Sequence, residues 1–281
     1  MKNFLKVCIV SLLCLMSASA WAQEDGVIRI LAIGNSFSAD AVEQHLHKIA
    51  SAGGYKLVIG NMRIGGCTLQ KHLDNAMTNK PAYKYVKITL EGKWTITKDI
   101  PLCEALGDEQ WDYVTFQQQS GRSGIYETWE DSLPDLVEYV RKRVPATTKV
   151  LIHQTWAYDP ASQHKGFINY DNDQEVMYRS IVDAVERASK LVKADGVIPS
   201  GTAIQNARTT MLRDSVTRDG YHLHKIFGRY IAACTYYETI FRKSVVGNSY
   251  SPQGMTPEQK AAAQKSAHSA VRRPDNVTQI K

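Results

Sequence analysis

The stretch VIRILAIGNSFS, residues 27–38, joins a short apolar run to a polar turn. Val27 to Ile33 is rich in β-branched residues and is followed by Gly34, a pattern typical of a buried parallel strand. Residues 39–52 then carry apolar side chains at helical spacing and stop at a glycine pair, which indicates the end of a helix. Ser36 therefore lies where a strand passes into a helix, either as a nucleophile or as the cap of that helix.

Four further strands are expected downstream, separated by helical patterns. The apolar runs lie at residues 56–62, 112–118, 149–155 and 196–200, and the helical patterns at about 129–143, 174–193 and 223–241. Strands that alternate with helices predict an α/β fold, here a three-layer α/β/α sandwich on a mainly parallel, about five-stranded flavodoxin-like sheet. Sheets of this kind bind ligands beyond the carboxyl ends of their strands.

One segment interrupts the alternation of strands and helices. Residues 83–100 alternate apolar and polar side chains on either side of Glu91-Gly92, which predicts an inserted β-hairpin at the edge of the sheet. Residues 257–281 are expected to form a polar, alanine-rich surface helix and a short tail. With no internal repeat and no linker, residues 23–281 are interpreted as one domain.

The N-terminus has the features of a secretory signal. Residues 1–22 open with two lysines, continue with an apolar run and end on Ala20-Trp21-Ala22, an A-x-A cleavage pattern. The expected location is therefore periplasmic or extracellular. Leu13 before Cys14 argues against a lipoprotein, and no other segment is apolar enough for stable membrane insertion.

Charge and cysteine content exclude several classes of protein. The formal net charge is only +6, and no basic run interleaved with aromatic residues suggests nucleic acid. Cys67, Cys103 and Cys234 lie far apart in the sequence, so a zinc site is not indicated. Two of them could still form one disulfide bond. The pair His222-x-His224 lacks further ligands, and we expect neither a metal nor an organic cofactor. Nothing in the sequence indicates an oligomeric state.

Two segments at predicted strand or helix ends could supply a nucleophile and its base. A serine hydroxyl needs a base at neutral pH, and Ser36 follows the first strand. Asp219 and His222, in RDGYHLH near the C-terminus, are three residues apart, so the carboxylate can orient the imidazole. The alternative is that Asp219 caps the last long helix and His222 is an ordinary surface residue.

Two other segments could stabilise an oxyanion. The glycine pair in RIGGCTL, residues 63–69, can present backbone N–H groups close to a substrate. QQQSG, residues 117–121, ends the third strand with side-chain amides, which can also donate. Because neighbouring side chains on a strand point to opposite faces, only one of Gln118 and Gln119 is expected to reach the cleft, and we favour Gln119.

Serine, glycine, amide and D-x-x-H, in that order along the chain, resemble the four blocks of the SGNH/GDSL hydrolases. ILAIGNSFSADA and DGYHL look closest to a bacterial branch rich in secreted members, with G-N-S in place of G-D-S. The resemblance implies a triad of Ser36, His222 and Asp219. It also implies an oxyanion hole formed by Ser36, Gly66 and Gln119.

The same resemblance implies a secreted serine esterase that hydrolyses an O-acyl ester, above all an O-acetyl ester on a carbohydrate. Asn35, Gln118 and Trp156 are the expected substrate contacts, since aromatic rings such as Trp156 can stack on sugars; a buried core position is the alternative for the tryptophan. A lipase or simple esterase remains an alternative, although no long apolar lid is present. A non-catalytic glycan-binding protein on the same fold is the other.

Overall fold

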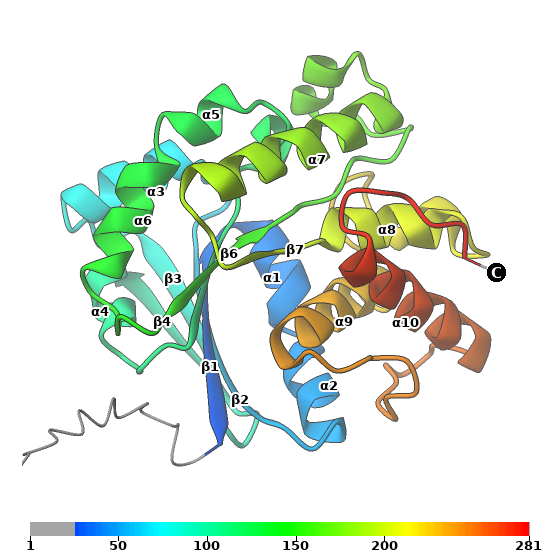
Figure 1. Ribbon diagram of the computed structural model, residues 1–281, viewed down its shortest axis with the longest axis horizontal. Coiled ribbons are helices and arrows are strands. Elements are labelled where there is room, and N and C mark those ends of the chain that lie inside the picture. The colour runs from blue at the N-terminus through cyan, green and yellow to red at the C-terminus, as the bar shows by residue number, and fades with distance from the viewer. Residues whose placement is uncertain (1–25, 281) are drawn as a thin grey trace, which may run out of the picture.

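The computed structural model describes residues 26–280 and shows a seven-stranded sheet between two layers of helices (Figure 1). The signal peptide expected over residues 1–22 lies outside the described residues. The order across the sheet is β4-β3-β2-β1-β5-β6-β7. The strands are β1 (Val27–Gly34), β2 (Lys56–Arg63), β3 (Tyr83–Ile88), β4 (Trp94–Ile100), β5 (Tyr113–Phe116), β6 (Lys149–His153) and β7 (Gly196–Ile198).

Five of these strands are parallel, as the sequence predicted. β1 pairs with β2 on one side and β5 on the other, and β6 and β7 follow, all in parallel. This is the flavodoxin-like order, in which the first strand lies between the second and the third parallel strands. β1 is almost entirely buried, which explains its continuous apolar run. The α/β class and the mainly parallel sheet are confirmed.

Helices cover both faces of the sheet (Figure 1). One layer contains α1 (Ser36–Val42), α2 (Leu46–Ala52), α8 (Ser200–Arg208), α9 (Phe227–Phe241) and α10 (Pro257–Arg272). The other contains α3 (Leu69–Met77), α4 (Leu102–Leu106), α5 (Glu127–Glu130), α6 (Leu133–Arg141) and α7 (Gln174–Leu191). The three-layer sandwich is therefore confirmed.

Two expected helices are each divided in two. The helix over residues 39–52 is broken between α1 and α2, where the buried Glu43 accepts hydrogen bonds from Asn61 and Arg63. The helix expected over residues 129–143 is broken at Ser132, and a proline in the first turn starts α6. α3, α4 and α8 were not predicted: α4 is only five residues long, whereas Leu69, Leu73 and Ala76 of α3 do have helical spacing and were overlooked.

The expected hairpin is present and extends the sheet. β3 and β4 pair antiparallel, and β3 also pairs antiparallel with β2. The hairpin thus adds two strands to the five parallel ones. It lies next to the carboxyl end of β2, where the glycine loop begins.

Candidate active site

The turn after β1 is capped by Asn35, not by Ser36. The Asn35 side chain accepts the backbone N–H of Phe37 at 2.9 Å, and Ser36 is the first residue of α1. An N-cap side chain satisfies an N–H group that the first helical turn leaves open. The interpretation of Ser36 as the helix cap is therefore wrong, and its hydroxyl is free for another partner.

That partner is His222. The Ser36 Oγ lies 2.9 Å from the Nε2 of His222, and the Nδ1 of His222 lies 2.7 Å from Asp219 Oδ2. The other carboxylate oxygen of Asp219 accepts the backbone N–H of His222 at 2.8 Å. The loop thus holds carboxylate, imidazole and hydroxyl in one hydrogen-bonded line, the arrangement in which an imidazole can take the serine proton.

Asp219, whose side chain is 39% exposed, is held in its charged form. Burial opposes ionisation, but the His222 side chain and the backbone N–H groups of His222 and Tyr221 hydrogen-bond the carboxylate and lower its pKa below the ordinary value. An ionised Asp219 fixes the proton of His222 on Nδ1. The Nε2 lone pair then faces Ser36, as a general base requires.

A buried ion-pair network fastens the His222 loop to the helix that carries Ser36. Asp40, on α1, is 2 % exposed. Its carboxylate pairs with Arg229 at 2.6 Å and Arg218 at 3.3 Å, and it accepts the backbone N–H of Leu223 at 2.8 Å. Because Leu223 follows His222 directly, Asp40 fixes the distance between α1 and the imidazole.

Asp40→Asn is expected to lower the free energy of unfolding by about 3 kcal/mol, because it leaves the partly buried Arg229 without a counterion and Arg218 with only Asp219, at 3.9 Å. Urea denaturation of both proteins measures the difference. Asp183→Asn is the matched control, since Asp183 pairs with Arg187 on the exposed face of α7 and the change there should be below about 0.5 kcal/mol. Equal losses in the two variants would contradict the role given to Asp40.

The glycine loop after β2 lies beside the Ser36 turn. The N–H of Ile64 donates to Gly34 O at 3.2 Å, and the Asn35 side chain donates to Cys67 O at 3.1 Å. Between these two anchors, Gly66 has φ +62°, a conformation that favours glycine. Within residues 26–280, the N–H groups of Gly66 and Ser36 donate to no acceptor. Both remain available to a ligand.

The anchor to Cys67 also explains the asparagine of the G-N-S block. An aspartate at position 35 could cap α1 equally well, but it has no N–H to donate to Cys67 O. The Asn35 carboxamide is oriented by Gln117, which donates to its Oδ1 at 2.9 Å. Gln117 in turn accepts from the buried His153. Asn35 thus joins the serine turn to the glycine loop.

The other two glutamines of QQQSG differ in availability. The Gln118 carboxamide is buried: its oxygen accepts the N–H groups of Leu69 and Gln119, and its nitrogen donates to Thr128. Within the described part of the chain, the half-buried Gln119 carboxamide forms no hydrogen bond. Of the two, Gln119 is the one whose amide is free to reach a ligand.

Three expected substrate contacts are wrong. Trp156 is fully buried, stacks on Phe37 with ring centroids 4.3 Å apart, and donates its Nε1–H to Tyr221 O at 2.7 Å. Asn35 and Gln118 are also buried, and their amides serve the protein's own backbone. These side chains support the serine turn and the His222 loop from within, so they do not offer a surface to a sugar.

His164 lies near the triad and was missed by the sequence analysis. Its ring centroid is 4.8 Å from that of Tyr221, which lies 4.2 Å from that of His222. Its Nδ1 accepts the N–H of Gly166 at 3.0 Å, which leaves the proton on Nε2. Burial, together with the nearby His222, lowers the His164 pKa despite Asp219, so the ring stays neutral. No motif surrounds it in the sequence.

Other features of the described residues can be stated briefly. Across residues 26–280 there is no group of three or more His, Cys, Asp or Glu side chains placed to hold a metal ion. Cys67, Cys103 and Cys234 are free thiols. None of the helices in this range is both long and apolar enough to span a membrane.

Comparison with solved structures gives the class of fold. A protein proposed to be an SGNH hydrolase, from Slackia heliotrinireducens, superposes with a TM-score of 0.52 at 22% identity, over 76% of this chain and 99% of that one. An acetylxylan esterase from Geobacillus stearothermophilus gives a TM-score of 0.48 at 10% identity, over 80% and 97% of the two chains. This chain has the fold of the SGNH hydrolases, as the four blocks predicted.

The family is defined more narrowly by sequence. A crystal structure of a DUF4886 family protein from Bacteroides uniformis is 51% identical, covers 90% of this chain and 98% of that one, and has a TM-score of 0.89. The model of the same family, a domain of unknown function, matches residues 29–270. The chain belongs to the DUF4886 family. No curated protein sequence matches it significantly.

Proposed function

We propose that this protein is a secreted serine esterase that cleaves an O-acyl ester through a covalent acyl-enzyme. The proposal rests above all on the line of hydrogen bonds that joins Ser36 to His222 and His222 to Asp219. A serine that caps no helix and faces a histidine oriented by a carboxylate is the arrangement that nucleophilic acyl transfer requires.

The reaction would run in two halves. His222 Nε2 accepts the Ser36 proton as Oγ attacks the ester carbonyl, and the N–H groups of Ser36 and Gly66 with the Gln119 amide hold the negative charge on the carbonyl oxygen. The tetrahedral intermediate expels the alcohol, which takes the proton from His222, and leaves an acyl-Ser36. Water then attacks that ester with His222 again as base, and releases the acid.

A carbohydrate O-acetyl ester is the substrate that the surroundings of the triad favour. His164 Nε2 and the carboxamide of Gln119 form no hydrogen bond with residues 26–280, and the half-buried Tyr221 ring lies against His222. Such groups suit the hydroxyls and flat faces of a sugar. The signal-like residues 1–22 place this activity outside the cytoplasm in our proposal.

The decisive experiment uses purified residues 23–281. We expect release of acetate from para-nitrophenyl acetate and from acetylated xylan or pectin, and phenylmethylsulfonyl fluoride should stop it by modifying Ser36, as peptide mass spectrometry would show. A simple esterase would act on the small ester alone. A protein that binds glycans but releases no acetate from any ester would replace the esterase with a binding protein.

Gln119→Ala is expected to reduce kcat about 100-fold with little change in KM, because an oxyanion donor acts mainly in the transition state. Steady-state kinetics on para-nitrophenyl acetate measures both constants. Gln118→Ala is the matched control: its amide serves Leu69 and Thr128, so that substitution should lower the thermal midpoint more than kcat. If Gln119→Ala retains full kcat, its amide does not contact the oxyanion.

A further inference from the structure

Three cations form a row across the hairpin edge of the sheet. In the strand register, Arg63 at the end of β2 lies opposite Lys84 on β3, and Lys84 lies opposite Lys98 on β4. Directly opposed residues point to the same face of a sheet. The register slips by one residue beside this row, where Asp99 has φ +55°, so the hairpin bends here. We call Arg63, Lys84 and Lys98 the cationic row.

The cationic row has three positive charges, and the cavity that it lines contains one carboxylate, Asp99. Like charges directly opposite each other destabilise a sheet. Arg63 pairs with Glu43 at 2.7 Å, but neither Lys84 nor Lys98 forms an ion pair with any residue from 26 to 280. Lys87, on the same strand as Lys84, pairs with both Asp108 and Glu109. Lys84 and Lys98 are therefore available to pair with an anionic ligand.

The row lines a cavity that adjoins the candidate active site. The cavity measures about 290 Å³ and is lined by Arg63, Ile64, Gly65, Ala82, Tyr83, Lys84, Lys98 and Asp99. Gly65 directly precedes Gly66, whose N–H donates to no acceptor among residues 26–280, and the N–H of Ile64 is bonded to the end of β1. A substrate whose ester carbonyl reaches Gly66 would therefore have its neighbouring units beside the cationic row.

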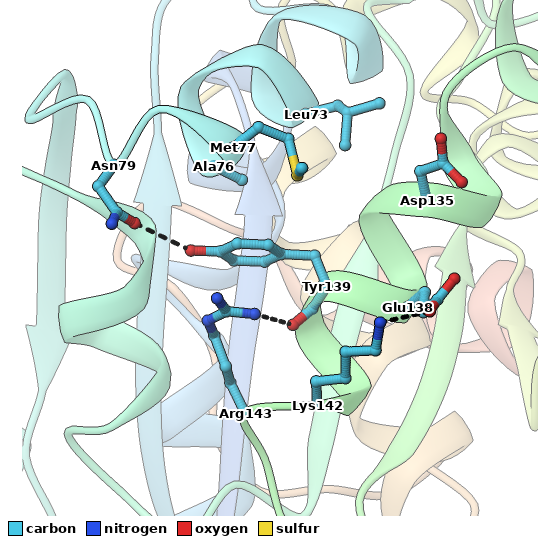
Figure 2. A pocket seen from close by; sticks show the side chains of 9 residues that line it. All are labelled: Leu73, Ala76, Met77, Asn79, Asp135, Glu138, Tyr139, Lys142 and Arg143. Carbon is cyan, nitrogen blue, oxygen red and sulfur yellow. Dashed lines mark hydrogen bonds and ion pairs between the residues drawn. The ribbon is translucent and has the colours of Figure 1, made fainter.

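A larger cavity elsewhere offers no comparable charge. Figure 2 shows that cavity, of about 410 Å³, between α3 and α6. Its lysine, Lys142, pairs with Glu138, and the guanidinium of Arg143 lies 3.6 Å from the ring centre of Tyr139 while donating to its carbonyl (Figure 2). Both cations of that cavity already have partners, so the cationic row is the better site for an anion.

We propose that the cationic row binds an anionic substituent of the substrate, a carboxylate or a sulfate ester, on a sugar unit next to the acylated one. This proposal rests on the proposed esterase function, because the bound glycan is a substrate only if the protein hydrolyses its ester. A lysine ammonium is a strongly hydrated point charge that attracts either anion. The enzyme would thus prefer acylated acidic glycans over neutral ones through electrostatic complementarity.

Binding can be tested without turnover. Isothermal titration calorimetry on Ser36→Ala should show trigalacturonate binding more tightly than neutral xylotriose, and a sulfated trisaccharide as a separate arm tells which anion is preferred. Lys84→Gln and Lys98→Gln in that background should each weaken binding of the preferred anion about fivefold, and sodium chloride should weaken it further. Equal binding of the neutral and anionic sugars would overturn the inference.

Kinetics gives a second test with an internal control. On acetylated pectin, Lys84→Gln and Lys98→Gln should raise KM about fivefold, whereas kcat/KM on para-nitrophenyl acetate, which is too small to reach the row, should not change. Lys93→Gln, an equal loss of charge at the turn of the same hairpin, is the control. Unchanged KM values on pectin would refute anion binding by the cationic row but would not affect the proposed esterase function. If the wild type hydrolyses no ester at all, the esterase function itself is refuted.

Discussion

Ser36→Ala and His222→Ala are each expected to reduce kcat on para-nitrophenyl acetate by about 10⁵-fold, and the double variant should be no slower than either one alone. The hydroxyl and the imidazole act as a unit, since neither can transfer the proton without the other, and triad residues in serine hydrolases show this non-additivity. Their 2.9 Å contact is the structural basis of the prediction. Circular dichroism would verify that all three variants fold.

Ser38→Ala provides a control on the same helix. The Ser38 hydroxyl is buried and lies 2.8 Å from two acceptors, Asn35 O and Asn61 Oδ1, so its loss should lower stability while kcat stays within about tenfold of the wild type. Retention of activity by Ser36→Ala would show that the nucleophile lies elsewhere. Additive losses in Ser36→Ala/His222→Ala would show that the two side chains do not act together.

The placement of the site was predictable because strand ends are local features of a sequence. An apolar run that ends in Gly34 defines β1, and parallel strands bring their carboxyl ends to one edge. The sequence therefore predicts that Ser36 and the glycine loop lie at the same edge of the sheet. The spacing of Asp219 and His222 likewise fixes their contact, because three residues form one turn of chain.

The supports of the site were not predictable, because they depend on contacts between distant segments. Trp156 follows β6 in a polar context that suits an exposed platform as well as a core position, and only its stacking on Phe37 decides between them. Asp40 pairs with Arg218 and Arg229, which lie far along the chain. Nothing in the sequence around a single aspartate on a short helix indicates that it forms these ion pairs. Tertiary packing also overrides the helical pattern at Glu43.

Acid is expected to unfold this protein steeply as pH falls from 6.5 toward 4.5, because three histidines are buried without charge. Burial lowers the pKa of His45 to about 4, despite a hydrogen bond to Lys225 O, and lowers the pKa of His72 and His153 to about 3. Each lies in the described core, His45 against Tyr250 and His153 between Gln117 and Ser200.

The sign of the effect follows from proton binding. Between the folded pKa values and the ordinary value of about 6.5, the unfolded chain binds protons that the folded chain excludes, so stability falls as pH falls. Well below pH 6.5, each histidine lowers the free energy of unfolding by up to about 1.4 kcal/mol for every pH unit. The three together lower it by about 4 kcal/mol for every pH unit. Since a typical domain is stable by about 5–15 kcal/mol and the loss at pH 5 is about 6 kcal/mol, we expect unfolding between about pH 5 and pH 4.

Urea denaturation at pH 7, 6 and 5 measures how steeply the free energy of unfolding changes with pH. The variant His45→Gln isolates the contribution of one histidine to this slope. A glutamine can still donate to Lys225 O and accept from Tyr250, but it does not titrate. Its slope should therefore be shallower than that of the wild type by about 1.4 kcal/mol per pH unit, even where its stability at pH 7 is lower. Parallel slopes for the two proteins would mean that His45 takes up its proton in the folded state, and that acid acts on the carboxylates instead.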